Sequence, residues 1–175
     1  VYMGVNDKLC PGTYTDFHEY EWSYNPNAKQ PAYDPAGAEK LLDQAGLPRG
    51  ADGTRFSTRI TSPPMMSFPD ACEVMKEHLR KVGINLIIES LDFGTWTDKV
   101  LVRRDCDISI SGGLQGPEPY ELFQFVGTTG GRPNYRNAMG YVNPKIDELF
   151  AQYRASVSLE ARKTAFWKVQ EILAE

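Results

Sequence analysis

The sequence has no hydrophobic run long enough to cross a bilayer. Its longest largely apolar stretch, VGINLII over residues 82–88, is far below the ~20 residues that a membrane-spanning helix needs. The first residues also lack the pattern of a signal peptide, although the sequence starts at a valine rather than a methionine. The sequence therefore predicts no membrane-spanning helix.

Cysteine and histidine are scarce. The three cysteines, Cys10, Cys72 and Cys106, are too few and too widely spaced for a zinc site. One disulfide is possible, and the sequence does not fix which pair forms it. Of the two histidines, His18 lies in an acidic stretch that favours solvent exposure over metal binding, and His78 lies on a predicted helix. No G-x-S-x-G motif supplies a nucleophile, so we expect no metal, no cofactor and no catalytic triad.

Basic clusters are absent as well. The chain has 19 lysines and arginines against 23 aspartates and glutamates, which gives a net charge of −4. Nucleic-acid binding needs a concentrated positive surface, so this class of function is excluded. Hydrophobic residues make up 41% of the chain and aromatic residues 11%, which is enough for a packed core. The length suggests one domain or one large piece of a bigger protein.

Strands and helices alternate in the middle of the chain. Aspartate and proline favour helix starts, and glycine favours helix ends. With these signals, the expected elements are a helix from Asp34 to Gly46, a strand over 54–62, a helix over 69–82, a strand over 84–90, a helix from Asp92 to about Arg104 and a strand over 107–111. Helical crossovers of this length imply a mainly parallel sheet flanked by helices, so the fold class is α/β.

The same patterns predict local features. Leu41 and Leu42 lie on the expected apolar face of the first helix, and Ser67 and Asp70 have the spacing of a capping box before the second. The strand INLIIES is apolar enough to be covered on both faces. GTTGGR, residues 127–132, predicts a mobile surface loop.

The two ends of the chain differ from the middle. Residues 1–33 are rich in aromatic residues and turn formers, which predicts an irregular segment with buried rings. The tail predicts two helices, capped by Asn143 and Ser158, whose spacing suits packing on the sheet. Their expected buried residues are Ile146, Leu149, Phe150 and Tyr153 in the first helix and Ala161, Ala165, Val169 and Ile172 in the second.

The loop over residues 112–119, GGLQGPEP, is the first candidate for a binding site. It follows the carboxyl end of a predicted parallel strand, which is where ligands bind in such sheets. Its glycines fit neither phosphate-binding pattern, but the missing side chains leave room for a bulky ligand. Asp107 and Glu118 would lie roughly 16 Å apart, at ~3.3 Å per extended residue, which is too far for shared acid–base catalysis. An enzyme is therefore disfavoured.

Further contacts are expected at the same end of the sheet. Met65 and Met66 follow another predicted strand and offer adaptable apolar surface, with core packing as an equal alternative. Phe93 and Trp96 open the third helix. We expect Phe93 to contact the ligand and Trp96 to lie in the core.

Three motifs, in order, resemble one family. YDPAGAEKLLDQAGLPRGADGTRF is similar to the Y-D-P-x-x-A-x-x-L-L-x-x-A-G-(x)-D-G-x-x-F stretch of the solute-binding proteins of ABC importers, in the dipeptide-, oligopeptide- and nickel-binding family (bacterial solute-binding protein family 5). GYVNPKIDELF resembles the family's G-Y-x-N-P-x-I-D-x-L, and SLEARKTAFWKVQEILAE its E-x-R…Q-x-I-L-x-E helix.

The resemblance implies a lobe of a larger fold. Members have two lobes that close over a ligand, in a type II-like periplasmic-binding-protein fold. This chain would be the C-terminal lobe, with residues 1–33 an irregular segment from the hinge side and residues 34–175 the α/β ligand-binding lobe. The N-terminal lobe and a final return segment are expected to be absent from it, so this piece alone should bind weakly or not at all.

The resemblance also bears on the ligand. Peptide-binding members read D-x-x-x-x-G-W-x-x-D in the loop, where the tryptophan packs on the ligand and the aspartate pairs with its α-ammonium group. Aligned without gaps, these two positions are Gly113 and Gly116. The family's following D-P looks like Glu118-Pro119, and an earlier ligand-facing tryptophan corresponds to Phe93. The loop thus lacks the amine anchor, so ligands without a free amine, such as oligosaccharides or opines, are expected beside peptides.

The sequence therefore predicts solute capture for ABC-type import. The expected ligand contacts are Phe93, Gly113, Leu114, Gln115, Glu118, Met65, Met66, Tyr135 and Asn137. The expected partners are a small solute or peptide and the permease subunits of an ABC importer; the complete protein is expected to be a monomer that is periplasmic or lipid-anchored outside the membrane. The alternatives are a small α/β hydrolase-like enzyme fragment, which would need a nucleophile or metal, and a protein-interaction module, which would expose an apolar patch on the tail helices.

Overall fold

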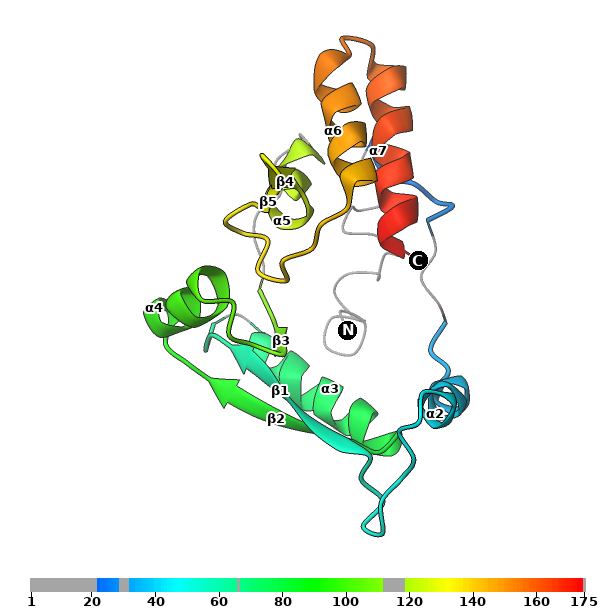
Figure 1. The fold of residues 1–175 in the computed structure, drawn as a ribbon, viewed down its shortest axis with the longest axis vertical. Helices are drawn as coiled ribbons and strands as arrows, with labels where there is room; N and C mark the ends of the chain where they lie inside the picture. The colour runs from blue at the N-terminus through cyan, green and yellow to red at the C-terminus, as the bar shows by residue number, and fades with distance from the viewer. Residues whose placement is uncertain (1–21, 29–31, 66, 112–118, 175) are drawn as a thin grey trace. The chain divides into compact units, whose positions relative to one another are not determined.

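The computed structural model describes residues 22–28, 32–65, 67–111 and 119–174. They form two compact units (Figure 1). Residues 32–111 make up the first, here named the sheet unit; residues 22–28 and 119–174 make up the second, named the helical unit. Within the described ranges, no helix is long and apolar enough to cross a membrane.

Three parallel strands form the centre of the sheet unit, in the order β2-β1-β3. Their bounds are Phe56–Ser62 for β1, Ile84–Ser90 for β2 and Ile108–Ser109 for β3. Phe56 lies opposite Ile84 at the start of the β1–β2 pair, and Ile60 lies opposite Ile108 on the other side of β1. The predicted parallel α/β sheet is therefore confirmed.

The helices of the sheet unit follow the predicted order. Their bounds are Pro35–Gln44 for α2, Phe68–Lys81 for α3 and Phe93–Trp96 for α4, which continues as a π-helical turn over Thr97–Val102. Asp34 caps α2 by accepting from the backbone N–H of Gly37 at 2.9 Å, and Gly46 has a φ of 76° as the predicted helix stop requires. The π-helical turn is a feature that the sequence pattern does not predict.

One face of the sheet packs against α3. Ile60 of β1 and Leu86 of β2 are buried against Cys72 of α3. The partly buried residues around them are Met75, Leu79, Ile88, Ile108 and Ile110. This small core fixes α3 to the sheet.

The opposite face of β2 is only partly covered, so the prediction that this strand is covered on both faces is wrong. In the described sheet β2 is an outer strand, and its residue Ile87 is 51% exposed. Polar side chains flank Ile87: Asn85 donates to the Ser57 hydroxyl at 3.0 Å, and Glu89 accepts from Thr61 at 2.9 Å. Ser57, Arg59 and Thr61 of β1 continue this polar face beside β2.

Two predictions about helices in this unit are also wrong. Leu41 of α2 is 67% exposed, and α2 has no buried residue; ion pairs of its Glu39 and Asp43 with Arg49 and Arg55 hold it instead. Ser67 precedes α3 but makes no side-chain cap hydrogen bond. Proline stands at the second position of α3 and has no N–H to donate, which removes one of the two donors that a capping side chain uses.

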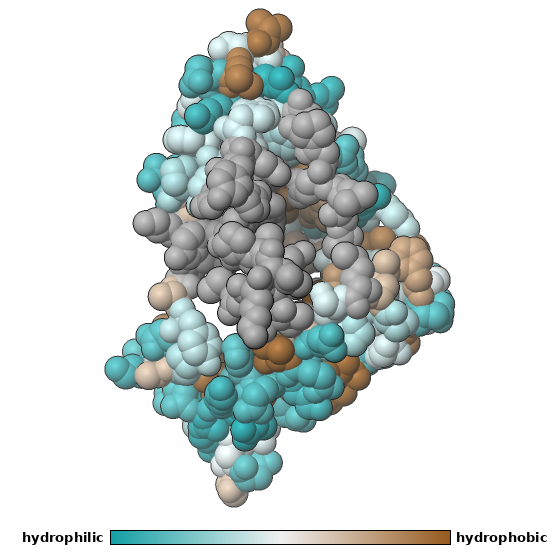
Figure 2. Space-filling view, turned by 180° about the vertical axis from the view of Figure 1, so that it is seen from behind, coloured by the Kyte–Doolittle hydropathy of each residue, from teal (hydrophilic) through white to brown (hydrophobic). Residues whose placement is uncertain are grey.

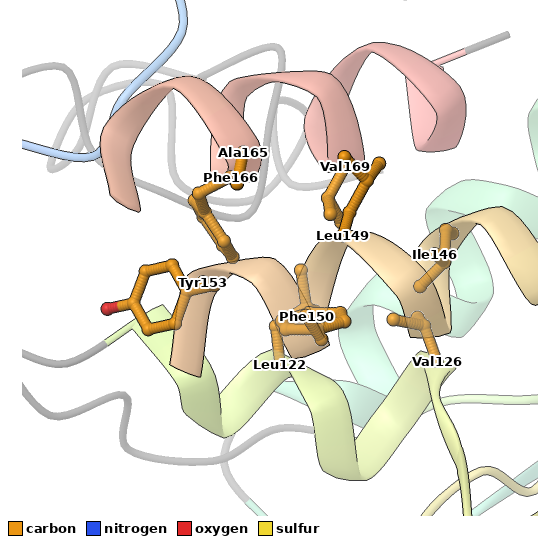
Figure 3. Close-up of a cluster of buried hydrophobic side chains, with 9 residues drawn as sticks. All are labelled: Leu122, Val126, Ile146, Leu149, Phe150, Tyr153, Ala165, Phe166 and Val169. Carbon is orange, nitrogen blue, oxygen red and sulfur yellow. The ribbon is translucent and has the colours of Figure 1, made fainter. Parts of the chain in front are cut away.

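The helical unit has its own hydrophobic core (Figure 3). The helices α6, Pro144–Ala155, and α7, Leu159–Ala174, pack on each other and on a short segment made of a 3₁₀ turn over Pro119–Leu122 and α5 over Phe123–Val126. In Figure 3 their apolar side chains point toward one another. The buried cluster is Leu122, Val126, Ile146, Leu149, Phe150, Tyr153, Ala165, Phe166 and Val169.

The predicted buried face of α6 is therefore confirmed in full, and Asn143 caps this helix through the Lys145 backbone N–H at 3.0 Å. On α7, Ala165 and Val169 are buried, but Ala161 is exposed and the buried Phe166 was not predicted. The core cluster of this unit contains no residue of the three strands; packing of the two helices on the sheet stays a prediction.

Hydrophobic residues exposed on α6, on α7 or in the turn between them are few. They are Val157 in the turn and Leu159 at the start of α7. The end of the molecule that holds this turn shows only small brown areas in Figure 2. Single exposed apolar side chains are ordinary on protein surfaces. The broad apolar patch that a protein-interaction module would need is not present on these two helices.

A buried glutamine joins the stretch 22–28 to α7. The Gln170 side chain accepts from the Asn25 backbone N–H at 3.1 Å and donates to the Ser23 carbonyl at 2.7 Å. Gln170 is 3% exposed and Asn25 fully buried. Trp22 of the same stretch is partly buried and packs against the core of the helical unit, as the predicted burial of aromatic rings requires. Residues 1–21 lie outside the described ranges.

The stretch 127–132 is not the mobile loop that its composition predicts. It forms a tight antiparallel hairpin of β4, Thr128–Thr129, and β5, Arg132–Pro133. Gly130 and Gly131 have φ angles of 60° and 75°, as a two-residue type I′ turn demands. Arg132 is exposed, as expected.

Replacing Gln170 with leucine should destabilise the helical unit. The leucine keeps the volume but leaves the Asn25 N–H and the Ser23 carbonyl without a partner, which costs about 1–3 kcal/mol for each buried group left unsatisfied. Denaturant unfolding measures the loss. The matched control is Q152L on α6, where Gln152 is exposed and bonds only to the Glu148 side chain; equal effects of the two substitutions would contradict this role of Gln170.

Candidate ligand-binding site

Two of the predicted contacts lie beyond the carboxyl ends of β1 and β2 in the sheet unit. Met65 follows the Pro63-Pro64 turn after β1, and its side chain is 41% exposed. Phe93 is the first residue of α4, after β2, and is 61% exposed. The parallel pairing puts both strand ends at the same edge, so both apolar side chains follow strand ends at that edge.

The start of α4 is held firmly. Asp92 accepts from the backbone N–H of Thr95 at 3.1 Å and from its hydroxyl at 2.5 Å. These bonds lower the pKa of Asp92 below its usual 3.8, and the bond from the hydroxyl has a larger effect than the bond from the backbone N–H. Asp92 is therefore ionised at neutral pH. The charged cap fixes the helix turn that carries Phe93.

Trp96 supports Phe93 from behind. Its ring stacks on Phe93 with the centroids 6.0 Å apart, and Trp96 itself is 4% exposed. Its indole N–H points to the Thr61 carbonyl of β1 at 3.4 Å. The predicted division between a buried Trp96 and an outward Phe93 is confirmed as to burial; contact of Phe93 with a ligand stays a prediction.

A half-buried ion pair connects the same helix to the sheet. Lys99 of the π-helical turn donates to both carboxylate oxygens of Glu89 on β2, at 2.7 and 2.8 Å. Thr61 also donates to Glu89, and an Arg59 guanidinium nitrogen lies 3.8 Å from it. The pKa of Glu89 lies below its usual 4.5, chiefly because the Lys99 side chain donates to it; partial burial opposes this effect, and the Thr61 hydroxyl adds to it.

The acidic and thiol groups of this unit have structural surroundings. Asp107, the residue before β3, accepts from the backbone N–H of Arg59 on β1 at 3.0 Å and so connects these two strands. Cys72 and Cys106 are free thiols whose pKa values are raised, chiefly by burial. Neither thiol is poised as a nucleophile. No group of histidine, cysteine, aspartate or glutamate within the described ranges could hold a metal ion.

The remaining described candidates lie in the helical unit. Tyr135 is 57% exposed in the loop between β5 and α6. Asn137 is fully buried: its side chain donates to the carbonyls of Gly127 and Tyr141 at 3.2 and 2.8 Å, and accepts from the Tyr141 N–H at 2.9 Å. Asn137 therefore shapes the loop that presents Tyr135.

The other predicted contacts cannot be placed. They are Met66, Gly113, Leu114, Gln115 and Glu118, which all lie outside the described residues. Cys10, the third cysteine, also lies outside them. Sequence reasoning missed the Glu89–Lys99 pair, because the two residues belong to different elements and no local spacing links them. The one signal for this pair in the sequence is the alternation within INLIIES. It places Glu89 on one face of the strand and Leu86 and Ile88 on the other.

A sequence profile described as bacterial extracellular solute-binding proteins, family 5 Middle, matches residues 5–134. The chain belongs to this family. The resemblance read from the three motifs is therefore confirmed. A family of solute-binding proteins supports a binding rather than a catalytic role for this member.

Individual relatives agree with this family 5 assignment. Di/tripeptide-binding protein 3 of Pseudomonas aeruginosa (strain UCBPP-PA14) is 29% identical over 167 residues, which are 89% of this chain and 29% of that protein. Two solved structures share the fold. The periplasmic binding protein DppA from Helicobacter pylori, in complex with peptide STSA, has a TM-score of 0.84 at 22% identity and covers 99% of this chain. NikZ from Campylobacter jejuni, in complex with Ni(L-His), has a TM-score of 0.73 at 21% identity and covers 87%.

The family 5 chain is short beside these proteins. It spans 29% of the Pseudomonas protein and 33% and 32% of the two structural neighbours. It therefore matches about a third of their length.

Lowering the pH should remove the stabilisation that Glu89 provides. The pKa of Glu89 is depressed in the folded state, so its contribution is complete above the unfolded pKa near 4.5 and is lost as the pH falls through the lower folded pKa. We expect E89Q to reduce the free energy of unfolding at pH 7 by on the order of 1 kcal/mol, since the pair is only partly buried. The difference between the two proteins should shrink progressively as the pH falls below 4.5.

Urea unfolding at pH 7 and at pH 3 measures this difference. The control is E148Q, because Glu148 forms an exposed pair with Lys145 on α6 and should contribute less. A stability gap between wild type and E89Q that persists unchanged at pH 3 would contradict the assignment.

Proposed function

We propose that this chain is the C-terminal lobe of a two-lobed protein that captures a solute for an ABC-type importer. Family membership over residues 5–134 is the observation that carries the proposal. The ligand would bridge two lobes and stabilise their closed form, which then docks on the permease. In thermodynamic terms, the ligand shifts an open–closed equilibrium by its higher affinity for the closed state.

The site on this lobe would begin with Phe93. Its exposed ring lies on a capped helix turn with Trp96 behind it, so a ligand group that stacks on it would lose little entropy to protein ordering. Met65 at the same edge would add adaptable apolar contact. The loop residues Gly113, Leu114, Gln115 and Glu118, with Met66, complete the proposed contacts of this region; Tyr135, held in place by Asn137, is a weaker candidate.

The ligand class is a peptide or another polar solute. The names of the Pseudomonas and Helicobacter relatives refer to peptides, which favours peptides. Gly113 and Gly116 stand where peptide-binding members carry the tryptophan and the amine-binding aspartate. This favours ligands without a free amine, such as oligosaccharides or opines, unless Glu118 or the other lobe replaces the anchor.

The family description as extracellular proteins supports a location outside the cytoplasmic membrane, which we propose is the periplasm or, for a lipid-anchored form, the outer surface of that membrane. The complete protein would act as a monomer without a cofactor. Its partners would be the solute and the permease subunits.

A thermal-shift screen of the two-lobed protein tests the proposal. Di- to pentapeptides are compared with oligosaccharides and opines, since a ligand present at about 100 times its Kd adds roughly 2.7 kcal/mol of stability. Stabilisation by at least one class is expected. Peptide hits would mean that another group replaces the lost amine anchor, and hits without an amine would mean that the two glycines changed the ligand class. Absence of any shift across all three classes would contradict solute capture of this kind.

Replacing Phe93 with alanine should weaken the binding of the strongest compound of the screen. An aromatic side chain at the centre of a contact contributes more than 1 kcal/mol, which corresponds to at least a fivefold rise in Kd. Calorimetry of the two-lobed protein measures it. The matched control is Y33A, because Tyr33 is similarly exposed, at 67% against 61% for Phe93, but lies before α2 rather than after a strand. Equal effects of F93A and Y33A would contradict the assignment of Phe93.

A further inference from the structure

The helix that carries Phe93 is short and changes its winding along its length. Trp96 and Val100 are its buried residues. Its second half, Thr97–Val102, is π-helical, which is a wide and unusual winding that is often found at functional sites. Arg104 follows with a φ of 54°, where a non-glycine residue is uncommon. Local helix geometry alone therefore does not hold this segment in one orientation.

Within the described ranges, two polar contacts connect this helix to β1 and β2, and they meet at Thr61. The Thr61 carbonyl receives the Trp96 indole N–H at 3.4 Å, which is long for a hydrogen bond. The Thr61 hydroxyl donates to Glu89 at 2.9 Å, and Glu89 receives Lys99 on both oxygens. The ion pair is thus the shorter and stronger of the two attachments.

The ion pair is also sheltered from water. The Lys99 side chain is 18% exposed and that of Glu89 25%, whereas the two side chains of the Lys145–Glu148 pair on α6 are 57% and 55% exposed. A sheltered pair with two short contacts holds one geometry, while an exposed pair gains little from doing so. The contact between helix and sheet is therefore directional.

From this arrangement we propose that Glu89 and Lys99 are positioning residues, which set the orientation of Phe93 toward the ligand by locking its helix onto β2. The inference rests on the proposed function, since it assigns these residues a role in the same site. Neither residue acts on the ligand directly. They act through the helix, with Trp96 as the link between Lys99 and the Phe93 ring.

The first test needs no ligand. In the 175-residue chain, NMR follows the Phe93–Trp96 ring contacts and the solvent exchange of the Trp96 indole N–H. K99M removes the charge at similar side-chain length, and we expect at least a tenfold faster indole exchange and loss of the ring contacts. K99R, which still pairs with Glu89, should restore both signals, and K145M on α6 should change neither.

A second variant is needed because Arg59 can pair with Glu89 when Lys99 is replaced; its guanidinium lies 3.8 Å from Glu89. E89L removes the acceptor of both cations and should reproduce the effect of K99M. Unchanged Phe93 and Trp96 signals in E89L would overturn the proposal whatever the protein binds.

The second test is a double-mutant cycle in the two-lobed protein. An equimolar library of di- to pentapeptides, oligosaccharides and opines serves as the probe, and the bound fraction at fixed concentration is the readout. E89L alone should weaken binding about threefold to tenfold, within the range of couplings between residues in one network. In the F93A background the same substitution should have no further effect.

The outcomes separate the two proposals. Weaker binding in F93A with unchanged binding in E89L overturns the positioning role and leaves the Phe93 contact standing. Additive losses also overturn it, because they mean that Glu89 acts by a route other than Phe93. Unchanged binding in F93A removes the proposed contact, and with it the role of Glu89 at that contact. A loss in both single variants that does not add supports the positioning role.

Discussion

Parallel pairing of β1 with β2 is the constraint on which the rest of the proposed site depends. The register from Phe56–Ile84 to Ser62–Ser90 ends both strands at one edge. Met65 and Phe93 therefore follow strand ends at the same edge although they are 28 positions apart in the sequence. The same register puts Thr61 opposite Glu89. It thereby builds the surface that Phe93 occupies and the polar support behind it from one set of backbone hydrogen bonds.

The two faces of this sheet have different roles. The face with Ile60 and Leu86 packs on α3 and forms the core of the sheet unit. The opposite face carries the alternating polar residues of β1 and the Glu89 network. The helical unit is stabilised separately by its own aromatic and aliphatic cluster and by the buried Gln170 contacts. Each unit thus has a hydrophobic core of its own.

Local signals in the sequence predict much of this fold. The caps at Asp34 and Asn143, the left-handed glycine at 46 and the buried face of α6 are all read from a few neighbouring residues, and all are found. The failures come from facts that lie outside a local window. The partly covered face of β2 depends on which strands flank it, and the exposure of Leu41 depends on what covers α2. Ser67 fails as a cap because of the proline that follows it at the second helical position.

The candidate site was predictable in part, for the same reason. Phe93 follows a strand and begins a helix, so its exposure could be read from the sequence together with the burial of Trp96. Asn137 was named as a ligand contact, but its side-chain bonds to Gly127 and Tyr141 are made within the loop. A sequence shows that an asparagine is present and not which backbone groups remain for it to satisfy. The Glu89–Lys99 pair could not be predicted, because no spacing rule links a residue of a strand to a residue of a π-helical turn.

Hydrogen–deuterium exchange of the two-lobed protein, with and without the compound that stabilises it most, tests the central claim most directly. If this chain is a ligand-binding lobe, the backbone N–H groups of Phe93–Trp96 should exchange more slowly with ligand bound. Those of α6 and α7, which are packed in their own core, should keep the same rates. Slower exchange confined to regions outside this chain, with Phe93–Trp96 unchanged, would show that the lobe does not contact the ligand through this helix.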